Sequence, residues 1–243
     1  MRDRIKTLVR NALRWKELVL DILFPPACLH CARPIPSGAA LLCTECLRTI
    51  RVHATFFCAE CKARLPENIK TCHKSAPFIL AAVTNYDEAV KSAIHQFKYR
   101  RWTSVMSVLT PHIRTYLERC PTLNDRYIVV PIPLHPARLR ERGFNQAELI
   151  ARVVADALHV PIRTDILKRT RRTHAQAELK DWQARADNLT NAFAVPPGML
   201  LENKNIILVD DVYTSGATMH DAARALRAAG ARKIIAFVIA KAG

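Results

Sequence analysis

Near the end of the chain, paired acids and a cluster of hydroxyls stand between an apolar run and a helical segment. The apolar run at residues 206–209 predicts a strand that is buried on both faces. Parallel sheets of such strands bind ligands just beyond the carboxyl ends of the strands. The polar segment that follows contains Asp210, Asp211, Thr214, Ser215, Gly216, Ala217 and Thr218. Its hydroxyls, with the free N–H groups of a starting helix, suit a phosphate group.

Each part of this segment has a predicted role. Gly216 has no Cβ and lets the backbone approach a ligand closely. Asp210 and Asp211 are placed to face ribose hydroxyls, or a Mg²⁺ ion that bridges them. Turn capping by Asp211 and Thr214 is the alternative that needs no ligand. The complete string resembles the 5-phosphoribosyl-1-pyrophosphate (PRPP) motif of type I phosphoribosyltransferases, which favours a pocket for a ribose 5′-phosphate.

A second set of chemically capable residues lies earlier, where seven of the eight cysteines fall between positions 28 and 72. Two-residue spacing lets both thiolates of a pair reach one tetrahedral ion, so we predict structural zinc on Cys28, Cys31, Cys43 and Cys46. Disulfides or free thiols are the alternative. A second site has fewer obvious ligands, because Ser75 stands where a further cysteine would complete it. Its candidates are Cys58, Cys61, Cys72 and His73, and crossed pairing between the two sets stays open.

Composition limits the class of protein. Half of the 243 residues are hydrophobic, which indicates a folded chain with one good core and a small satellite domain. Lys and Arg outnumber Asp and Glu by 37 to 21, and the net charge of +16 favours a nucleic acid, an anionic membrane face or pyrophosphate as partner. We find no apolar run of membrane-spanning length and no signal-peptide pattern, so we expect the cytoplasm, where thiols stay reduced.

The chain divides into three predicted parts: residues 1–25, 26–76 and 77–243. The first is a basic amphipathic helix, which either packs on its own domain or lies on an anionic membrane surface. Pro25-Pro26 ends it and opens the cysteine-rich module. In the third part, strands at 78–86, 127–132, 162–167, 206–209 and 233–239 alternate with helices at 87–99, 103–117, 144–158, 182–189 and 217–229. This alternation predicts an α/β fold with a parallel sheet flanked by helices.

With these elements in place, the chain resembles the ComF family, a group associated with natural competence in bacteria. The resemblance covers nearly everything after Phe24. It rests on the cysteine module, Phe97-Lys98-Tyr99, Val130-Pro131-Ile132-Pro133, Arg142-Gly143-Phe144-Asn145-Gln146, the 169–176 loop with Arg185, Asn188 and Phe193, and the PRPP string. It implies a zinc module on a type I phosphoribosyltransferase domain, and a part in uptake or processing of incoming single-stranded DNA. Competence or recombination proteins are the implied protein partners.

Transfer from PRPP breaks the bond between ribose C1 and pyrophosphate, so an active enzyme needs cations or Mg²⁺ near the leaving group. The resemblance implies two sources, each of which also reads as a solvated surface run. The turn after the 127–132 strand leads to Arg138, Arg140 and Arg142. The 168–174 segment, with Arg169, Arg171 and Arg172, resembles the hood that closes over substrate. Thr214 replaces the Asp of purine-salvage relatives and is a poor general base, so no catalytic residue is assigned.

Residues 97–102 interleave aromatic and basic side chains, as surfaces that bind single strands do. Lys98, Tyr99, Arg100 and Arg101 are the candidate nucleic-acid contacts, and a helix end with Phe97 and Tyr99 buried is the alternative. Two functions therefore compete. The first is a PRPP-binding phosphoribosyltransferase that serves DNA uptake. The second is a non-catalytic single-stranded DNA adaptor with a regulatory or vestigial PRPP pocket, and a purely structural partner protein is a third interpretation.

Overall fold

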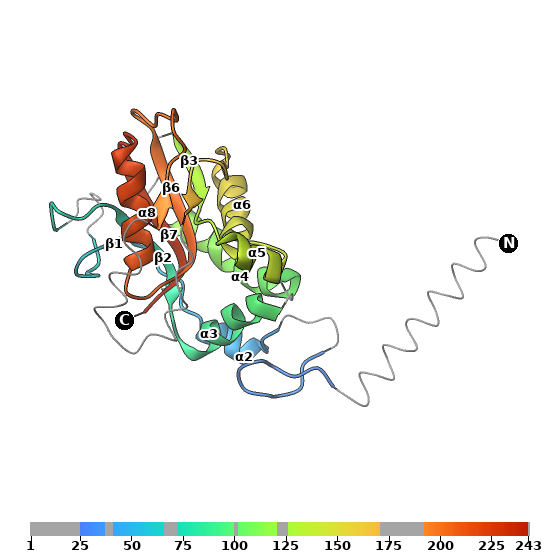
Figure 1. The fold of residues 1–243 in the computed structure, drawn as a ribbon. Helices are drawn as coiled ribbons and strands as arrows, with labels where there is room; N and C mark the ends of the chain where they lie inside the picture. The colour runs from blue at the N-terminus through green and yellow to red at the C-terminus, as the bar shows by residue number, and fades with distance from the viewer. Residues whose placement is uncertain are drawn as a thin grey trace.

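The computed structural model (Figure 1) describes residues 25–36, 41–65, 72–99, 102–120, 126–170 and 192–242. The amphipathic helix expected at residues 2–24 and the short helix expected at 182–189 lie outside this part of the chain. Among the described helices, none is both long enough and apolar enough to cross a bilayer.

A five-stranded sheet in the order β1-β2-β7-β6-β3 forms the centre of the molecule. Its strands are β1 (Phe57–Cys58), β2 (Ile79–Asn85), β7 (Lys233–Lys241), β6 (Asn205–Tyr213) and β3 (Tyr127–Pro131). The last four are parallel, as the alternation of strands and helices predicts, and their carboxyl ends therefore meet at one edge. The short β1 strand belongs to the cysteine-rich segment and pairs antiparallel with β2, so that segment shares the sheet.

The helices begin and end at local signals. Asp87 accepts a hydrogen bond from the N–H of Val90 (3.0 Å) and caps α3, and Asn145 caps α6 in the same way through Ala147 (3.1 Å). Gly143 adopts a left-handed conformation and ends α5. The described helices are α2 (Thr44–Thr49), α3 (Glu88–His95), η1 (Gln96–Tyr99), α4 (Trp102–Arg119), α5 (Pro136–Arg142), α6 (Gln146–Leu158) and α8 (Ala217–Ala228).

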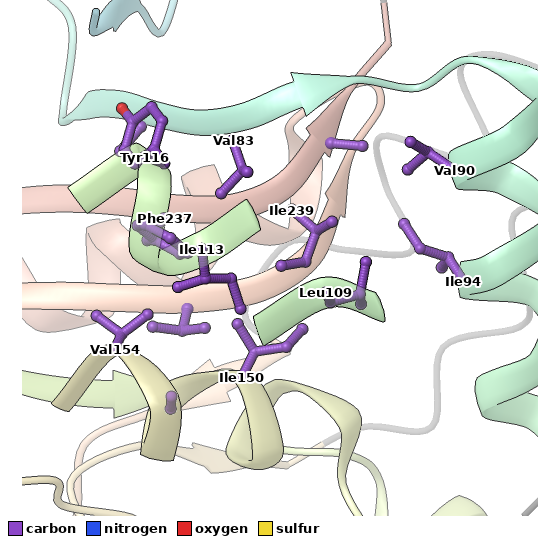
Figure 2. Close-up of a cluster of buried hydrophobic side chains, with 14 of the residues drawn as sticks. Val83, Val90, Ile94, Leu109, Ile113, Tyr116, Ile150, Val154, Phe237 and Ile239 are labelled. Carbon is purple, nitrogen blue, oxygen red and sulfur yellow. The ribbon is translucent and has the colours of Figure 1, made fainter. Parts of the chain in front are cut away.

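Alternating residues of each strand supply two apolar layers, one on each face of the sheet. In β2, Ala81 and Val83 face the layer that α3, α4 and α6 cover, and Leu80 and Ala82 face the layer that α8 covers. Figure 2 shows the first layer, where Tyr116, Ile113 and Leu109 of α4 meet Val83, Phe237 and Ile239 of the sheet and Ile150 and Val154 of α6. Covering both faces explains the uninterrupted apolar strands and fixes the sheet edge that positions the site.

The strand predicted at residues 162–167 is wrong. Only Ile162 bridges to the sheet edge, at Val129, and the chain then bends away. A two-pronged ion pair between Arg163 and Asp165 (2.7 and 2.6 Å) lies at this bend. The strand that forms next is β4 (Lys168–Arg169), which pairs antiparallel with β5 (Phe193–Ala194) in a separate two-stranded sheet. Short-range polar contacts at this bend compete with the apolar character of the segment.

Candidate functional site

The predicted pocket lies at the carboxyl end of β6, beside the start of α8. β6 continues past Val209 through both acids to Tyr213, because β7 offers it pairing partners as far as Lys241. α8 then begins directly after Gly216. Gly216 is the N-cap residue and has no side chain that could accept a hydrogen bond from the first turn of the helix. The helix start therefore presents mainly the backbone N–H groups of its first turn. The strand end and the helix start thus meet around residues 214–216.

A recess of about 230 Å³ opens at this junction. Asp210 and Asp211 are half-buried beside it, whereas Thr214 and Ser215 are exposed. Its lining residues are Asp210, Asp211, Val212, Tyr213, Thr214, Ser215, Gly216, Ala217, Thr218 and Met219. All seven residues of the predicted PRPP site therefore line one recess. Their role in binding stays a prediction.

The two acids are held in an environment that disfavours their charge. Burial raises the pKa of Asp210 well above its ordinary value, and the neighbouring Asp211 raises it further. Burial also raises the pKa of Asp211. The N–H of Asp211 donates to Asp210 (2.9 Å) and that of Val212 donates to Asp211 (2.8 Å), but within the described residues neither carboxylate has a salt bridge. A bound cation, or hydrogen bonds from sugar hydroxyls, would stabilise the charged form of these carboxylates.

Gly216 is required by the protein itself as well as by any ligand. Its φ of 79° lies in the left-handed region. A Cβ at this position would also stand 2.4 Å from the phenol oxygen of Tyr213 and 2.6 Å from its Cζ. The loop therefore rests on the ring of Tyr213, which sequence reasoning did not assign to the site.

The three arginines that follow the predicted pyrophosphate turn lie on a helix, α5, whose geometry separates them. Arg138 and Arg142 are four residues apart and share a helix face, whereas Arg140 lies on another face and is exposed. Although burial raises the pKa of Asp211, the charge of Arg142 acts on that carboxyl in the opposite direction. Arg142 is thus electrostatically coupled to the acids of the recess.

The base of the predicted hood is a two-stranded ribbon. Arg169 on β4 stacks on the ring of Phe193 on β5, with its Cζ 5.3 Å from the ring centre. Burial lowers the pKa of the Arg169 guanidinium and the charge of Arg138 lowers it further, whereas Asp210 acts in the opposite direction. Arg169 is therefore electrostatically coupled to Arg138 and to the Asp210 carboxyl. Arg171 and Arg172 lie outside the described residues.

Asp221 on α8 fastens this ribbon to the helix that starts at the recess. Its Oδ2 accepts hydrogen bonds from the N–H groups of Ala192 (2.8 Å) and Phe193 (3.2 Å), and its Oδ1 pairs with Arg224. Sequence reasoning missed Asp221, because an acid at one position of an amphipathic helix gives no sign that a distant strand will cover it. The ribbon and the recess are thus held by the same helix.

The nucleic-acid candidates fall largely beyond what the structure describes. Phe97 is buried in the core, as the alternative interpretation expects. Lys98 and Tyr99 belong to η1, where only their backbone is described, and Arg100 and Arg101 lie outside the described residues. Contact with DNA at this segment stays a prediction.

Seven of the eight cysteines gather into two separate clusters, and Cys120 belongs to neither. In the first, the ligand atoms of Cys28, Cys31, Cys43 and Cys46 all lie within 4.8 Å of one another. The N–H of Cys43 donates to Cys28 Sγ (3.3 Å), and Cys31 and Cys43 Sγ lie 3.6 Å apart. Four thiolates about 2.3 Å from one zinc ion would lie about 3.8 Å apart, so the set fits structural zinc. A hydrogen bond from Arg33 lowers the pKa of Cys31 to about 6, which favours the metal-binding thiolate.

The second cluster comprises Cys58, Cys61, Cys72 and His73, again with ligand atoms within 4.8 Å of one another. Cys61 and Cys72 Sγ are 3.3 Å apart, and His73 Nδ1 lies 3.5 Å from Cys58 Sγ and 3.3 Å from Cys72 Sγ. His73 therefore takes the place that Ser75 leaves open, and the pairs are not crossed between the clusters. Cys58 is buried, whereas the other three ligands are exposed.

Comparison with known proteins agrees with both parts of this architecture. The phosphoribosyl transferase domain family matches residues 144–243, and the double zinc ribbon domain family matches residues 19–76. The DNA utilization protein YhgH of Escherichia coli K12 is 30% identical over 158 residues, which cover 64% of this chain and 68% of that protein. The chain belongs to the ComF family. Its fold is the type I phosphoribosyltransferase fold, preceded by a double zinc ribbon.

Two further ComF-family relatives come from other bacteria. Competence protein ComFC of Bacillus subtilis strain 168 is 32% identical over 60% of this chain, and the match spans only 56% of that protein. Competence protein F of Haemophilus influenzae is 29% identical, covering 67% of this chain and 72% of the relative. Among solved structures, the glutamine PRPP amidotransferase of B. subtilis overlays with a TM-score of 0.39 at 17% identity, covering 60% of this chain and 30% of that one.

Proposed function

We propose that this ComF-family chain binds PRPP with Mg²⁺ and acts as a phosphoribosyltransferase. One observation carries the proposal: paired acids with raised pKa values and a hydroxyl-rich helix start share a single recess at the carboxyl end of β6. Residues 214–218 would hold the 5′-phosphate through hydroxyl and backbone N–H donors. Asp210 and Asp211 would bind the ribose hydroxyls and the Mg²⁺ that accompanies them.

In this proposal, the arginines near the recess stabilise the charge that develops on the leaving group. Negative charge develops on pyrophosphate as the bond to ribose C1 breaks, and positive charge develops on the ribose ring. Arg138 and Arg142 of α5, with Arg169 of β4, would stabilise the departing pyrophosphate, while the two acids face the ribose. Mg²⁺ supplies further charge neutralisation when it is bound. The acceptor that attacks C1 is left unassigned.

We place this activity in natural competence, in the uptake or processing of incoming single-stranded DNA in the cytoplasm. The support is the naming of the relatives as competence and DNA utilization proteins, together with the net charge of +16, which suits a polyanion. Protein partners would then be components of DNA uptake or recombination. The basic charge also suits peripheral contact with the inner face of the membrane.

Calorimetry with PRPP and Mg²⁺ tests the binding proposal. We expect wild type to bind, and the double variant Asp210→Ala/Asp211→Ala to lose at least about tenfold in affinity, because hydrogen bonds to charged groups are worth about 1.5–3 kcal/mol. A matched variant, Glu118→Ala/Glu202→Ala, removes two exposed acids that do not line the recess and should bind as wild type does. Equal affinity in all three proteins would remove the acids from the site.

The second candidate function is a non-catalytic adaptor for single-stranded DNA in which the PRPP pocket is regulatory or vestigial. The chain has 37 Lys and Arg residues against 21 Asp and Glu residues, and this basic excess favours the adaptor function. Release of pyrophosphate from PRPP, assayed with candidate bases and with single-stranded DNA as acceptors, separates the two functions. Turnover supports the transferase, and DNA binding without turnover supports the adaptor.

A further inference from the structure

Tyr213 connects the PRPP loop, residues 214–218, to the second cysteine cluster. Its side chain is 2% exposed, and its phenol O–H donates to the carbonyl of Ala59 at 2.9 Å. Ala59 directly follows Cys58 and lies inside the Cys58-x-x-Cys61 turn that supplies two of the four ligands. The last residue before the loop is therefore anchored to the backbone of a metal-binding turn that is 154 residues away in sequence.

The same phenol ring also packs directly against the backbone of the loop at Gly216. The close approach of Gly216 leaves no room for a Cβ above the Tyr213 oxygen and ring. Gly216 precedes α8, so a displaced ring would move the backbone N–H groups that begin this helix. The position of the ring is fixed on its remaining sides by Phe78, whose ring meets it edge-on at 6.3 Å, and by His220 Nε2, 3.4 Å from the phenol oxygen.

A backbone route runs in parallel with this side-chain route. The carbonyl of Tyr213 accepts from the N–H of Ala242 (2.8 Å), and the carbonyl of Ala242 accepts from Lys62 Nζ (3.4 Å). Lys62 closes the metal-binding turn, because its N–H donates to the carbonyl of Cys58 (3.0 Å). Both the ring and the main chain of Tyr213 are thus tied to one turn.

We infer that the second cysteine cluster positions the PRPP loop through Tyr213, so that phosphate affinity depends on metal occupancy of this cluster. The inference rests on the proposed PRPP site. Zinc bound to Cys58 and Cys61 would fix the turn that presents the Ala59 carbonyl. Cys61, Cys72 and His73 are exposed, whereas two ligands of the first cluster, Cys28 and Cys46, are buried. Zinc would therefore exchange with solvent more readily at the second cluster than at the first. Tyr213 is a positioning residue in this scheme.

Tyr213→Phe is the direct test, because it keeps the ring under Gly216 and removes the hydroxyl that donates to Ala59 and contacts His220 Nε2. We expect zinc content to stay as in wild type. Hydrogen exchange of the 214–218 amides should rise, and PRPP affinity should fall about fivefold, the equivalent of one neutral hydrogen bond. Tyr116→Phe is the matched control. Its buried phenol also donates to a backbone carbonyl of the cysteine-rich segment, at Thr55 (3.0 Å), but it lies on the opposite face of the sheet.

Ligand variants test the metal dependence without PRPP. Cys61→Ser/Cys72→Ser should lose one zinc ion and show faster exchange at 214–218, whereas Cys31→Ser/Cys43→Ser should lose one zinc ion with no change there. Equal exchange at 214–218 in wild type and in the second-cluster variant would overturn the inference. Failure of wild type to bind PRPP would instead contradict the proposed function. In that case hydrogen exchange at 214–218 would still show whether the second cysteine cluster is coupled to the loop.

Discussion

At the scale of single residues, Asp210 and Asp211 lie in an environment that disfavours their charged form. Each is half-buried, each has a raised pKa, and each carboxylate accepts a hydrogen bond from the N–H of the residue that follows it. A protein selected for stability alone would not place two acids side by side in this way. Binding sites commonly carry such a cost, because the groups that a ligand needs are the ones that the empty site leaves poorly compensated.

Asp210→Asn should therefore stabilise the chain while it weakens PRPP binding. At pH 7 we expect about 1 kcal/mol of added stability, which corresponds to a rise in Tm of about 2–4 °C. A carboxyl whose folded pKa is raised makes the wild type less stable as pH rises from its unfolded pKa of about 3.9 through its folded pKa. The advantage of the variant is thus present above this window and disappears below it.

Thermal unfolding of wild type and Asp210→Asn at several pH values measures this difference directly. Taking the difference between the two proteins cancels the titration of the zinc ligands and of carboxyls that do not interact with Asp210, so that only Asp210 and the neighbouring Asp211 contribute. A variant that is less stable than wild type at neutral pH would show that a cation already stabilises the Asp210 carboxylate in the unliganded protein.

At the scale of elements, α5 decides which of the three arginines share a helix face. The sequence supplies three at alternate positions, and a turn would leave their directions open. A helix places Arg138 and Arg142 on one face and Arg140 on another. The helix itself forms because His135 caps it, Pro136 suits its first turn and Gly143 ends it in a left-handed conformation.

We expect Arg142→Ala to lower PRPP affinity by about tenfold or more, because the lost contact is to a charged group. Arg140→Ala, a loss of the same side chain from the same helix, should stay within about twofold of wild type. Calorimetry with PRPP and Mg²⁺ compares them. If both variants weaken binding equally, the arginines act as a diffuse positive field rather than through one helix face.

At the scale of the whole molecule, the cysteine-rich segment and the parallel strands form one structure. β1 extends the sheet, His53 N–H donates to the carbonyl of Val83 (2.8 Å), and Tyr116 and Tyr213 donate to this segment from opposite faces of the sheet. The zinc ribbon is therefore placed to influence the phosphoribosyltransferase domain. The net charge of +16 is that of the whole chain, with both parts included.

This charge makes a prediction about DNA. Binding to single-stranded DNA should weaken with salt, with a slope of log affinity against log salt of about −3 if roughly four phosphates are contacted. Lys98→Ala/Arg100→Ala/Arg101→Ala should reduce the slope by about two units, since each lost contact removes about 0.7. Fluorescence anisotropy with a labelled oligonucleotide measures both slopes.

The control for this measurement is a triple variant of exposed basic residues elsewhere, Arg48→Ala/Arg51→Ala/Lys204→Ala, which has the same net charge as the test variant. An equal change of slope in the two variants would assign DNA affinity to overall charge rather than to residues 98–101. A slope near zero in wild type would count against DNA binding through phosphate contacts altogether.

The sequence by itself determined the order of the parallel strands β2, β3, β6 and β7 and of the helices α3, α4, α6 and α8, the strand–loop–helix around Asp210 and Asp211, and the first cysteine cluster. These features depend on residues that are near one another in the chain, so periodicity and spacing report them. Only the tertiary structure decided that His73 completes the second cluster, that the charge of Arg142 acts on the Asp211 carboxyl, and that Tyr213 reaches Ala59. Such contacts join distant segments after the sheet has formed, and no local pattern encodes which side chain will arrive there.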